Sequence, residues 1–296
     1  MNIKDVSSIG NLRVEINSDF KSLGLVSQIK DEMLIFIESE NYISEANKNE
    51  SVKVAITKEE FKDSFREDIT LAFSDNPRES FFKIHNYLFD NTDFYGTSFE
   101  NDISQSAKIY PNVYIAPKSV KIGENVVIEP NVVIMENVII EDNVIVRAGS
   151  VIGSEGFEYK RLGDTILSVK HAGGVIIRKK AEIGSNCCVD KAVFSDFTEI
   201  GEDTKLDNLV HVAHEVKIGK RVFIPAGVII SGSVIIEDDV WIGPNATISN
   251  GLRIGENAFV SLGAVVINDV KDGERVSGNF AIDHRKLLRF LVKIMK

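Results

Sequence analysis

The sequence of 296 residues has little of several features that define other classes of protein. It has two cysteines, Cys187 and Cys188, and because they are adjacent they are poor partners for an ordinary disulfide, so we expect a reducing compartment. Basic residues are outnumbered, with 34 Lys and Arg against 44 Asp and Glu, a net charge of −10. That balance argues against a dedicated nucleic-acid binder, whose affinity depends on neutralising phosphates with a basic face.

Long apolar runs are also missing. No stretch approaches the roughly 18 apolar residues that a transmembrane helix needs, so we expect no transmembrane segment. The first residues, MNIKDVSSIG, lack the basic region and apolar core of a signal peptide, so we expect a cytoplasmic location. Hydrophobic residues make up 44% and charged residues 26%, which is the composition of a folded protein and excludes a wholly disordered chain.

Aliphatic residues, by contrast, are dense after residue 100 and recur every six residues. The longest run consists entirely of Ile, Leu and Val at Ile200, Leu206, Val212, Ile218, Ile224, Ile230, Ile236, Ile242, Ile248, Ile254, Val260 and Val266. A second run is Ile122, Ile128, Ile134, Ile140, Val146 and Ile152. A period of six is three strand steps, so it predicts a short strand and a bend repeated three times in each coil of about eighteen residues. The expected fold is mainly β, a parallel β-helix shaped as a triangular prism.

The repeat also divides the chain. Residues 1–100 show no six-residue phase and mix helix-like and strand-like patterns, which predicts a small α/β domain. The β-helix occupies 101–281, with a break in phase between Ile152 and Ile177. A loop leaving a regular scaffold often carries function, and the alternative is a tolerated insertion. Residues 282–296 predict a short amphipathic helix, either a cap that packs against neighbouring subunits or a docking site for an acidic carrier protein.

One histidine has a position that suggests chemistry. His214 lies eighteen residues before Gly232, so the prism stacks the glycine directly on the histidine. A base and an unobstructed backbone N–H are what acyl transfer to an amine requires. The alternatives are a structural histidine at a turn and a zinc hydratase with three histidines on adjacent coils; no third histidine has that spacing, so we expect no metal.

The segments GSEGFEYKR, DNLVHVAH and IPAGVIISGSVII resemble the UDP-3-O-acylglucosamine N-acyltransferases of lipid A biosynthesis, which are hexapeptide-repeat acyltransferases. The resemblance implies a left-handed helix, a homotrimer, His214 as general base and Gly232 as oxyanion donor. It also implies uracil between Phe36 and Tyr42, for which the alternative is two aromatics of a small core. Further substrate-binding residues implied by the resemblance are Phe157, Tyr159, His171, Asp207 and Asn208.

The sequence also departs from that family. Ser39 stands where the family has asparagine, no second histidine occurs near Asn250, the C-terminal helix is short, and SGNFA resembles the ending of short-chain acetyltransferases that use coenzyme A. The predicted activity is N-acyl transfer from a phosphopantetheine thioester to a nucleotide-linked amino sugar, with no permanently bound cofactor. The donor stays open between acyl carrier protein and coenzyme A. The alternatives are an acyl-CoA-dependent enzyme that acylates a nucleotide amino-deoxysugar for surface glycans, and a non-catalytic scaffold.

Overall fold

The computed structural model describes residues 1–96, 98–278 and 283–294, and within it the chain forms two compact units. The first comprises Met1–Glu100, Glu155–Gly174 and Lys191–Phe197. The second comprises Asn101–Ser154, Val175–Asp190 and Thr198–Lys296. Two segments that interrupt the repeat are therefore part of the first unit, in addition to the predicted 1–100. Sequence reasoning identified only the earlier interruption.

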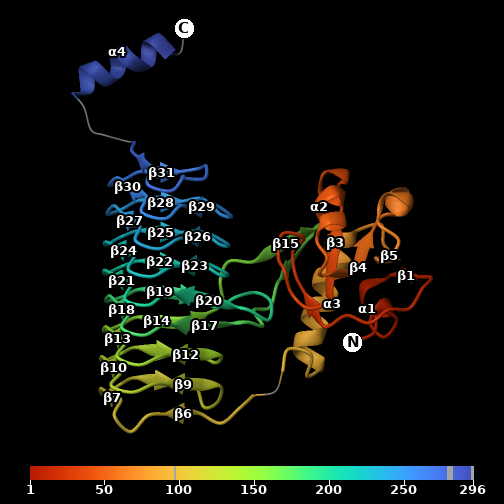
Figure 1. Ribbon diagram of the computed structural model, residues 1–296, viewed down its shortest axis with the longest axis horizontal. Helices are drawn as coiled ribbons and strands as arrows, with labels where there is room; N and C mark the ends of the chain where they lie inside the picture. The colour runs from red at the N-terminus through yellow and green to blue at the C-terminus, as the bar shows by residue number, and fades with distance from the viewer. Residues whose placement is uncertain (97, 279–282, 295–296) are drawn as a thin grey trace. The chain divides into compact units, whose positions relative to one another are not determined.

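The second unit is a prism of short parallel strands stacked one coil above another (Figure 1). Within the described residues its first face contains β7 (Lys108–Ile109), β10 (Val127–Ile128), β13 (Ile145–Val146), β18 (Glu182–Ile183), β21 (Lys205–Leu206), β24 (Phe223–Ile224), β27 (Trp241–Ile242), β30 (Phe259–Val260) and β32 (Arg275–Val276). The second face contains β8 (Tyr114–Ile115), β11 (Val133–Ile134), β14 (Val151–Ser154), β19 (Cys188–Asp190), β22 (His211–Val212), β25 (Ile229–Ile230), β28 (Thr247–Ile248) and β31 (Val265–Val266). The third face contains β6 (Asp102–Ile103), β9 (Val120–Ile122), β12 (Val138–Ile140), β17 (Gly174–Ile177), β20 (Phe197–Ile200), β23 (Lys217–Ile218), β26 (Ile235–Ile236) and β29 (Arg253–Ile254).

The six-residue aliphatic period fills the inside of this prism. Ile128, Ile134 and Ile140, one from each face, are all buried, and the residue four places after each is a buried valine. Successive coils pair in register, as Lys205 does with Phe223 eighteen residues later. The predicted fold class is confirmed: the protein is mainly β, with a left-handed parallel β-helix, a small N-terminal α/β region and a short C-terminal helix.

The corners of the prism are made by residues in the left-handed backbone conformation. This conformation is uncommon for residues other than glycine, and asparagine tolerates it better than most. Asparagines occupy four successive corners with φ between 55° and 63°: Asn125, Asn131, Asn137 and Asn143. The same six-residue step thus sets both the buried ladder and the corner ladder.

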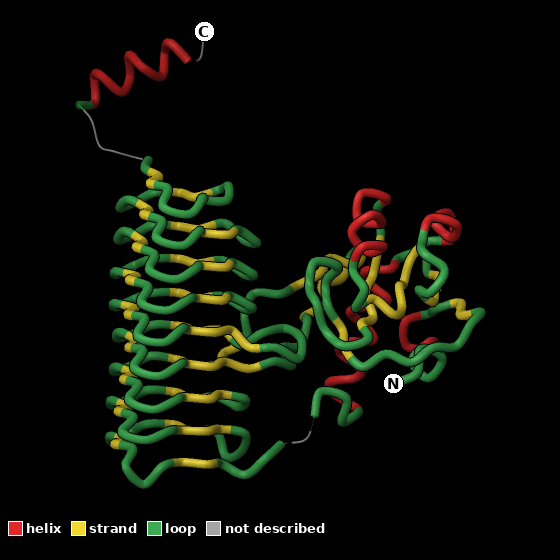
Figure 2. The backbone as a smooth tube through the Cα atoms, viewed as in Figure 1, coloured by secondary structure: helices red, strands yellow, loops and turns green. Residues whose placement is uncertain are grey.

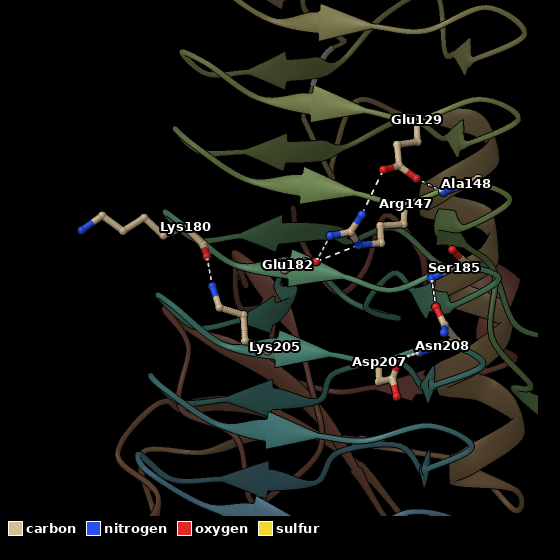
Figure 3. A network of polar contacts seen from close by, with 9 residues as sticks. All are labelled: Glu129, Arg147, Ala148, Lys180, Glu182, Ser185, Lys205, Asp207 and Asn208. Carbon is tan, nitrogen blue, oxygen red and sulfur yellow. Dashed lines mark hydrogen bonds and ion pairs between the residues drawn. The ribbon is translucent and has the colours of Figure 1, made fainter.

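Charged side chains also connect successive coils. On the first face, Arg147 donates to Glu129 at 3.1 Å and also contacts Glu182, so one guanidinium bridges the carboxylates of the two neighbouring coils (Figure 3). These carboxylates, Glu182 first, raise the pKa of Arg147. On the third face, Arg178 bridges Glu141 and Glu199 in the same way, at 3.0 and 2.6 Å.

The first unit is built on a five-stranded sheet in which only β1 runs antiparallel to its neighbour, β5. Its elements before residue 100 are α1 (Ser7–Gly10), β1 (Arg13–Val14), β2 (Ser22–Leu23), β3 (Met33–Ile37), η1 (Glu40–Tyr42), α2 (Ile43–Lys48), β4 (Val52–Thr57), η2 (Glu59–Ser64), β5 (Thr70–Phe73) and α3 (Pro77–Asn91). Figure 2 distinguishes these helices from the strands. The first interruption adds a hairpin of β15 (Tyr159–Leu162) and β16 (Thr165–Ser168).

Both interruptions of the β-helix contribute to the core of this first unit. Phe194 is fully buried against Phe81 of α3, with ring centroids 5.8 Å apart. The amide of Asn86, also on α3, donates to the carbonyl of Ser168 and accepts from the backbone of Lys170. The sequence 155–174 is therefore an integral part of a folded unit rather than a tolerated insertion.

The predicted C-terminal helix is present as α4 (His284–Ile294). Its side chains Leu288, Phe290 and Leu291 are exposed. Among the described residues, no helix combines the length and apolar character needed to cross a membrane. Of the SGNFA segment noted above, residues 279–281 lie outside the described residues.

Candidate acyl-transfer site

The predicted stacking of Gly232 on His214 is found in the second unit. His214 follows β22 and Gly232 follows β25, at the same corner of adjacent coils, and the Ser233 N–H donates to the His214 carbonyl at 2.9 Å. A Cβ placed on Gly232 would lie 2.6 Å from Cε1 and 2.8 Å from Nε2 of His214. No real side chain fits at such distances, so the imidazole occupies the space that glycine alone leaves open.

A carboxylate that sequence reasoning missed lies beside this histidine. Glu215 Oε2 is 3.7 Å from His214 Nδ1, and the Glu215 side chain is only 5% exposed. Its backbone N–H donates to the hydroxyl of the fully buried Thr198 at 2.9 Å, which fixes the turn. A carboxylate on the Nδ1 side favours the tautomer that carries its proton there and leaves Nε2 to act as a base. The sequence does show that Glu215 directly follows His214. It does not show that the Glu215 side chain is buried.

Asp207 and Asn208 lie at the preceding corner of the same coil (Figure 3). The Asp207 carboxylate accepts from the Asn208 N–H at 2.7 Å, and the Asn208 side-chain oxygen accepts from the Ser185 N–H at 2.8 Å, one coil away. These hydrogen bonds stabilise the turn that contains Asp207 and Asn208. The carboxylate that lies beside His214 belongs to Glu215, not to Asp207. Asp207 also lines a cavity of about 280 Å³ with Phe223 and Trp241 on the first face. Contact of Asp207 or Asn208 with a substrate stays a prediction.

The other predicted residues belong to the first unit. Phe157 is 86% exposed and its ring packs edge-on against that of Tyr159, with centroids 5.0 Å apart. His171 is 1% exposed, and its Nε2 accepts from the backbone N–H of Gly156 at 3.2 Å. Its imidazole therefore holds the backbone of this segment, and the contact of His171 with a substrate stays a prediction. Sequence spacing gave no sign of this burial.

The two N-terminal aromatics line one cavity of about 330 Å³, also within the first unit. Tyr42 is half-exposed there, and Phe36 is partly buried in the sheet strand β3. Arg78, at the start of α3, lies 5.8 Å from the Phe36 ring centroid and forms an ion pair with Glu38 at 2.8 Å. A cavity with an aromatic on its wall and a guanidinium beside it suits a nucleobase and an attached phosphate.

Comparison with known proteins identifies the repeat. The model of the bacterial transferase hexapeptide (six repeats) matches residues 119–154, 197–232 and 233–268. Among solved structures, the UDP-N-acetylglucosamine acyltransferase from Campylobacter jejuni is similar at 20% identity and a TM-score of 0.48, covering 64% of this chain and 80% of that one.

Sequence relatives are named more specifically. UDP-3-O-acylglucosamine N-acyltransferase 1 of Legionella pneumophila (strain Paris) is 49% identical over 79 residues, which cover 27% of this chain and 22% of that protein. UDP-3-O-acylglucosamine N-acyltransferase 2 of Legionella pneumophila (strain Philadelphia 1) is 49% identical over 152 residues, 50% of this chain and 44% of that protein. The chain thus spans less than half the length of the curated relatives it matches. It contains hexapeptide repeats and is similar to the UDP-3-O-acylglucosamine N-acyltransferases, as its sequence segments indicated.

Proposed function

We propose that this protein is an N-acyltransferase that moves an acyl group from a phosphopantetheine thioester to the amine of a nucleotide-linked amino sugar. The observation that carries the proposal is the contact between His214 and Gly232, which brings an imidazole and a backbone N–H together at one corner of the prism. The names of the sequence relatives support the choice of an amino sugar linked to UDP. We further propose a cytoplasmic homotrimer, in which neighbouring prisms form the cleft that receives the acyl chain.

The chemistry follows from the two groups. Nε2 of His214 takes a proton from the amine as its nitrogen attacks the thioester carbonyl, which forms the new C–N bond and a tetrahedral oxyanion. Within the described residues the Gly232 N–H donates no hydrogen bond, so it is available to stabilise that oxyanion. The intermediate then breaks its C–S bond, and the departing thiolate takes the proton from the imidazolium. The nearby Glu215 carboxylate stabilises the positive imidazolium while it exists.

The cavity of Phe36 and Tyr42 is proposed to hold the nucleotide. A nucleobase that stacks between two aromatic side chains is stabilised by both rings. The Arg78 guanidinium is suited to bind a phosphate of the same nucleotide. The residues proposed here need no permanently bound cofactor for the transfer itself, since the thioester arrives on its own carrier. Whether that carrier is acyl carrier protein or coenzyme A is left to the experiment.

The test is a matrix of donors and acceptors on the purified protein, read as release of free thiol. It pairs 3-hydroxyacyl carrier protein and short acyl-CoAs with UDP-3-O-acylglucosamine and several nucleotide amino-deoxysugars. In the productive pair we expect His214→Ala to lower kcat by about 10²–10⁴-fold, because the general base is lost. Tyr42→Ala should raise KM for the nucleotide sugar with kcat nearly unchanged.

The control is Lys53→Ala, since Lys53 is an exposed side chain of β4 that takes no part in the proposed chemistry. Wild-type turnover by His214→Ala would remove the assignment of the base. Turnover only with an acyl-CoA and a deoxysugar would favour the surface-glycan enzyme. A folded protein that turns over no pair would favour the non-catalytic scaffold.

A further inference from the structure

Three side chains of different chemistry converge on the second face of the prism, and none of them is used in the proposed transfer. Cys188 and Asp190 are on β19, and His211 is on β22, the next strand of that sheet, where it pairs directly with Cys188. A donor atom from each lies within 4.8 Å of the other two. Thiolate, carboxylate and imidazole are ligands of zinc and of similar divalent transition metals.

The distances between these atoms fit a tetrahedral ion. Zinc bonds of about 2.3 Å to sulfur and about 2.0–2.1 Å to oxygen and nitrogen place sulfur and oxygen about 3.5 Å apart, and oxygen and nitrogen about 3.3 Å apart. Cys188 Sγ is 3.5 Å from Asp190 Oδ1. His211 Nε2 is 3.8 Å from the other carboxylate oxygen, Oδ2, and this histidine side chain is 38% exposed. Both separations are close to those between ligands of one ion.

A further polar side chain, Ser154, hydrogen-bonds to the cluster. Asp190 is only 5% exposed, and the Ser154 hydroxyl, from β14 one coil earlier, donates to its Oδ1 at 2.7 Å. The same hydroxyl oxygen lies 3.1 Å from Cys188 Sγ. Carboxylates that bind metals are commonly oriented by such a hydrogen bond.

We propose that Cys188, Asp190 and His211 bind one divalent transition-metal ion of the zinc type, with the fourth position open to solvent on the exposed side of His211. Two anionic ligands and a neutral imidazole balance the charge of such an ion. The ligands come from the two coils that flank Lys191–Phe197, the second interruption of the repeat. The ion would therefore connect β19 to β22 where the coil is longer than a regular one.

This site could not be predicted from the sequence, for two reasons. A search for histidines at coil spacing finds none, because two of the three ligands are not histidines. Cys188 and His211 are also five residues further apart than one regular coil, since the second interruption lies between them. Only the strand pairing places them together.

Cobalt is the probe, because Co²⁺ binds in zinc sites and its absorption spectrum depends on the ligands that surround it. Full-length protein without a histidine tag is treated with a chelator, dialysed and titrated with Co²⁺. We expect one equivalent to produce the visible bands of a tetrahedral ion and the near-ultraviolet band of a thiolate ligand, and one equivalent of Zn²⁺ to remove both. An excess of Mg²⁺ should leave the bands in place, because it prefers oxygen ligands.

Matched variants identify the ligands. Cys188→Ser should abolish the thiolate band and His211→Gln should weaken Co²⁺ binding at least tenfold. Cys187→Ala is the control for the first, since this adjacent thiol is buried in the prism, where the equivalent position of the next coil holds Val210. His284→Gln is the control for the second. Ser154→Ala should weaken binding less than the ligand variants do.

These readouts do not depend on acyl transfer, so failure of the metal site and failure of the proposed function are distinguishable. Circular dichroism checks that each variant retains the β-helix. In addition, Zn²⁺ should raise the Tm of the wild type and of Cys187→Ala, but not that of Cys188→Ser. Octahedral Co²⁺ bands without a thiolate band would overturn the proposal. So would full Co²⁺ affinity in His211→Gln, or loss of the thiolate band in Cys187→Ala.

Discussion

The regular coils and the interrupted coils of the prism bring side chains together by different means. From Lys205 to Ile248 the paired strand residues of successive coils are eighteen positions apart, so one spacing places Gly232 on His214. In the interrupted stretch, Ile152 pairs with Val189 and Val189 with Val212, and neither step is one regular coil. The proposed acyl-transfer pair thus depends on the repeat, whereas the proposed metal ligands meet because the repeat is broken.

The difference also shows how each stretch is stabilised. A regular strand has one buried aliphatic residue and one outward residue, and its free energy comes mainly from the buried ladder. The interrupted stretch adds close backbone contacts and polar side chains, such as the hydrogen bonds of Asn86 with the segment that contains Ser168 and Lys170. We therefore expect the two stretches to respond to different substitutions.

The largest change in stability should come from the buried ladder of the regular coils. Ile236 is 1% exposed and Ile235, its neighbour on β26, is 45% exposed. Ile236→Ala should lower the free energy of unfolding by about 2–5 kcal/mol, because it leaves a cavity between coils. Ile235→Ala, the matched control, should cost less than about 1 kcal/mol. Urea unfolding measures both. Equal losses would show that the outward face is packed over and would contradict the inside–outside division.

That division could be predicted from the sequence, and so could the stacking of Gly232 on His214, because a strict period fixes which residues are neighbours. Three features could not. The burial of Glu215 and His171 depends on segments far away in sequence, and the cluster of Cys188, Asp190 and His211 depends on the exact length of an interruption. The six-residue period determines the strand register only in the coils where it continues. Contacts made by the interrupting segments can be known only from the structure.

A smaller effect is expected in the interrupted stretch, at a position where two backbone segments pack closely. A Cβ on Gly173 would lie 2.3 Å from the Phe194 carbonyl oxygen and 2.4 Å from that of Asp196. Gly173→Ala should therefore cost about 1–3 kcal/mol, because backbone atoms must shift. Hydrogen exchange should increase in 155–174 and 191–197 and stay unchanged in the coils after Lys205. Gly278→Ala is the control, since no atom of the described residues other than its chain neighbours lies within 4 Å of its added Cβ. Faster exchange throughout the prism would show that the two stretches unfold together.

The smallest effect concerns a polar corner of the regular prism. Asp142 Oδ1 accepts from the Glu124 N–H at 3.0 Å, and Oδ2 lies 3.0 Å from Lys179 Nζ. The backbone hydrogen bond, followed by the lysine, lowers the pKa of Asp142 below its ordinary value of 3.8. A lowered carboxyl pKa stabilises the fold above the unfolded pKa, and this contribution is lost as the pH falls through the folded pKa.

Asp142→Asn tests this sign directly, because asparagine keeps an acceptor for the Glu124 N–H but has no charge to titrate. We expect the variant to be slightly less stable than the wild type at pH 7, and the difference to shrink as the pH approaches 3. Urea unfolding across this range measures it, with Asp164→Asn in the β15–β16 turn as the control. A difference in the free energy of unfolding that stays constant with pH would contradict this account. It would mean that the Asp142 side chain stabilises the corner through its geometry and not through its charge.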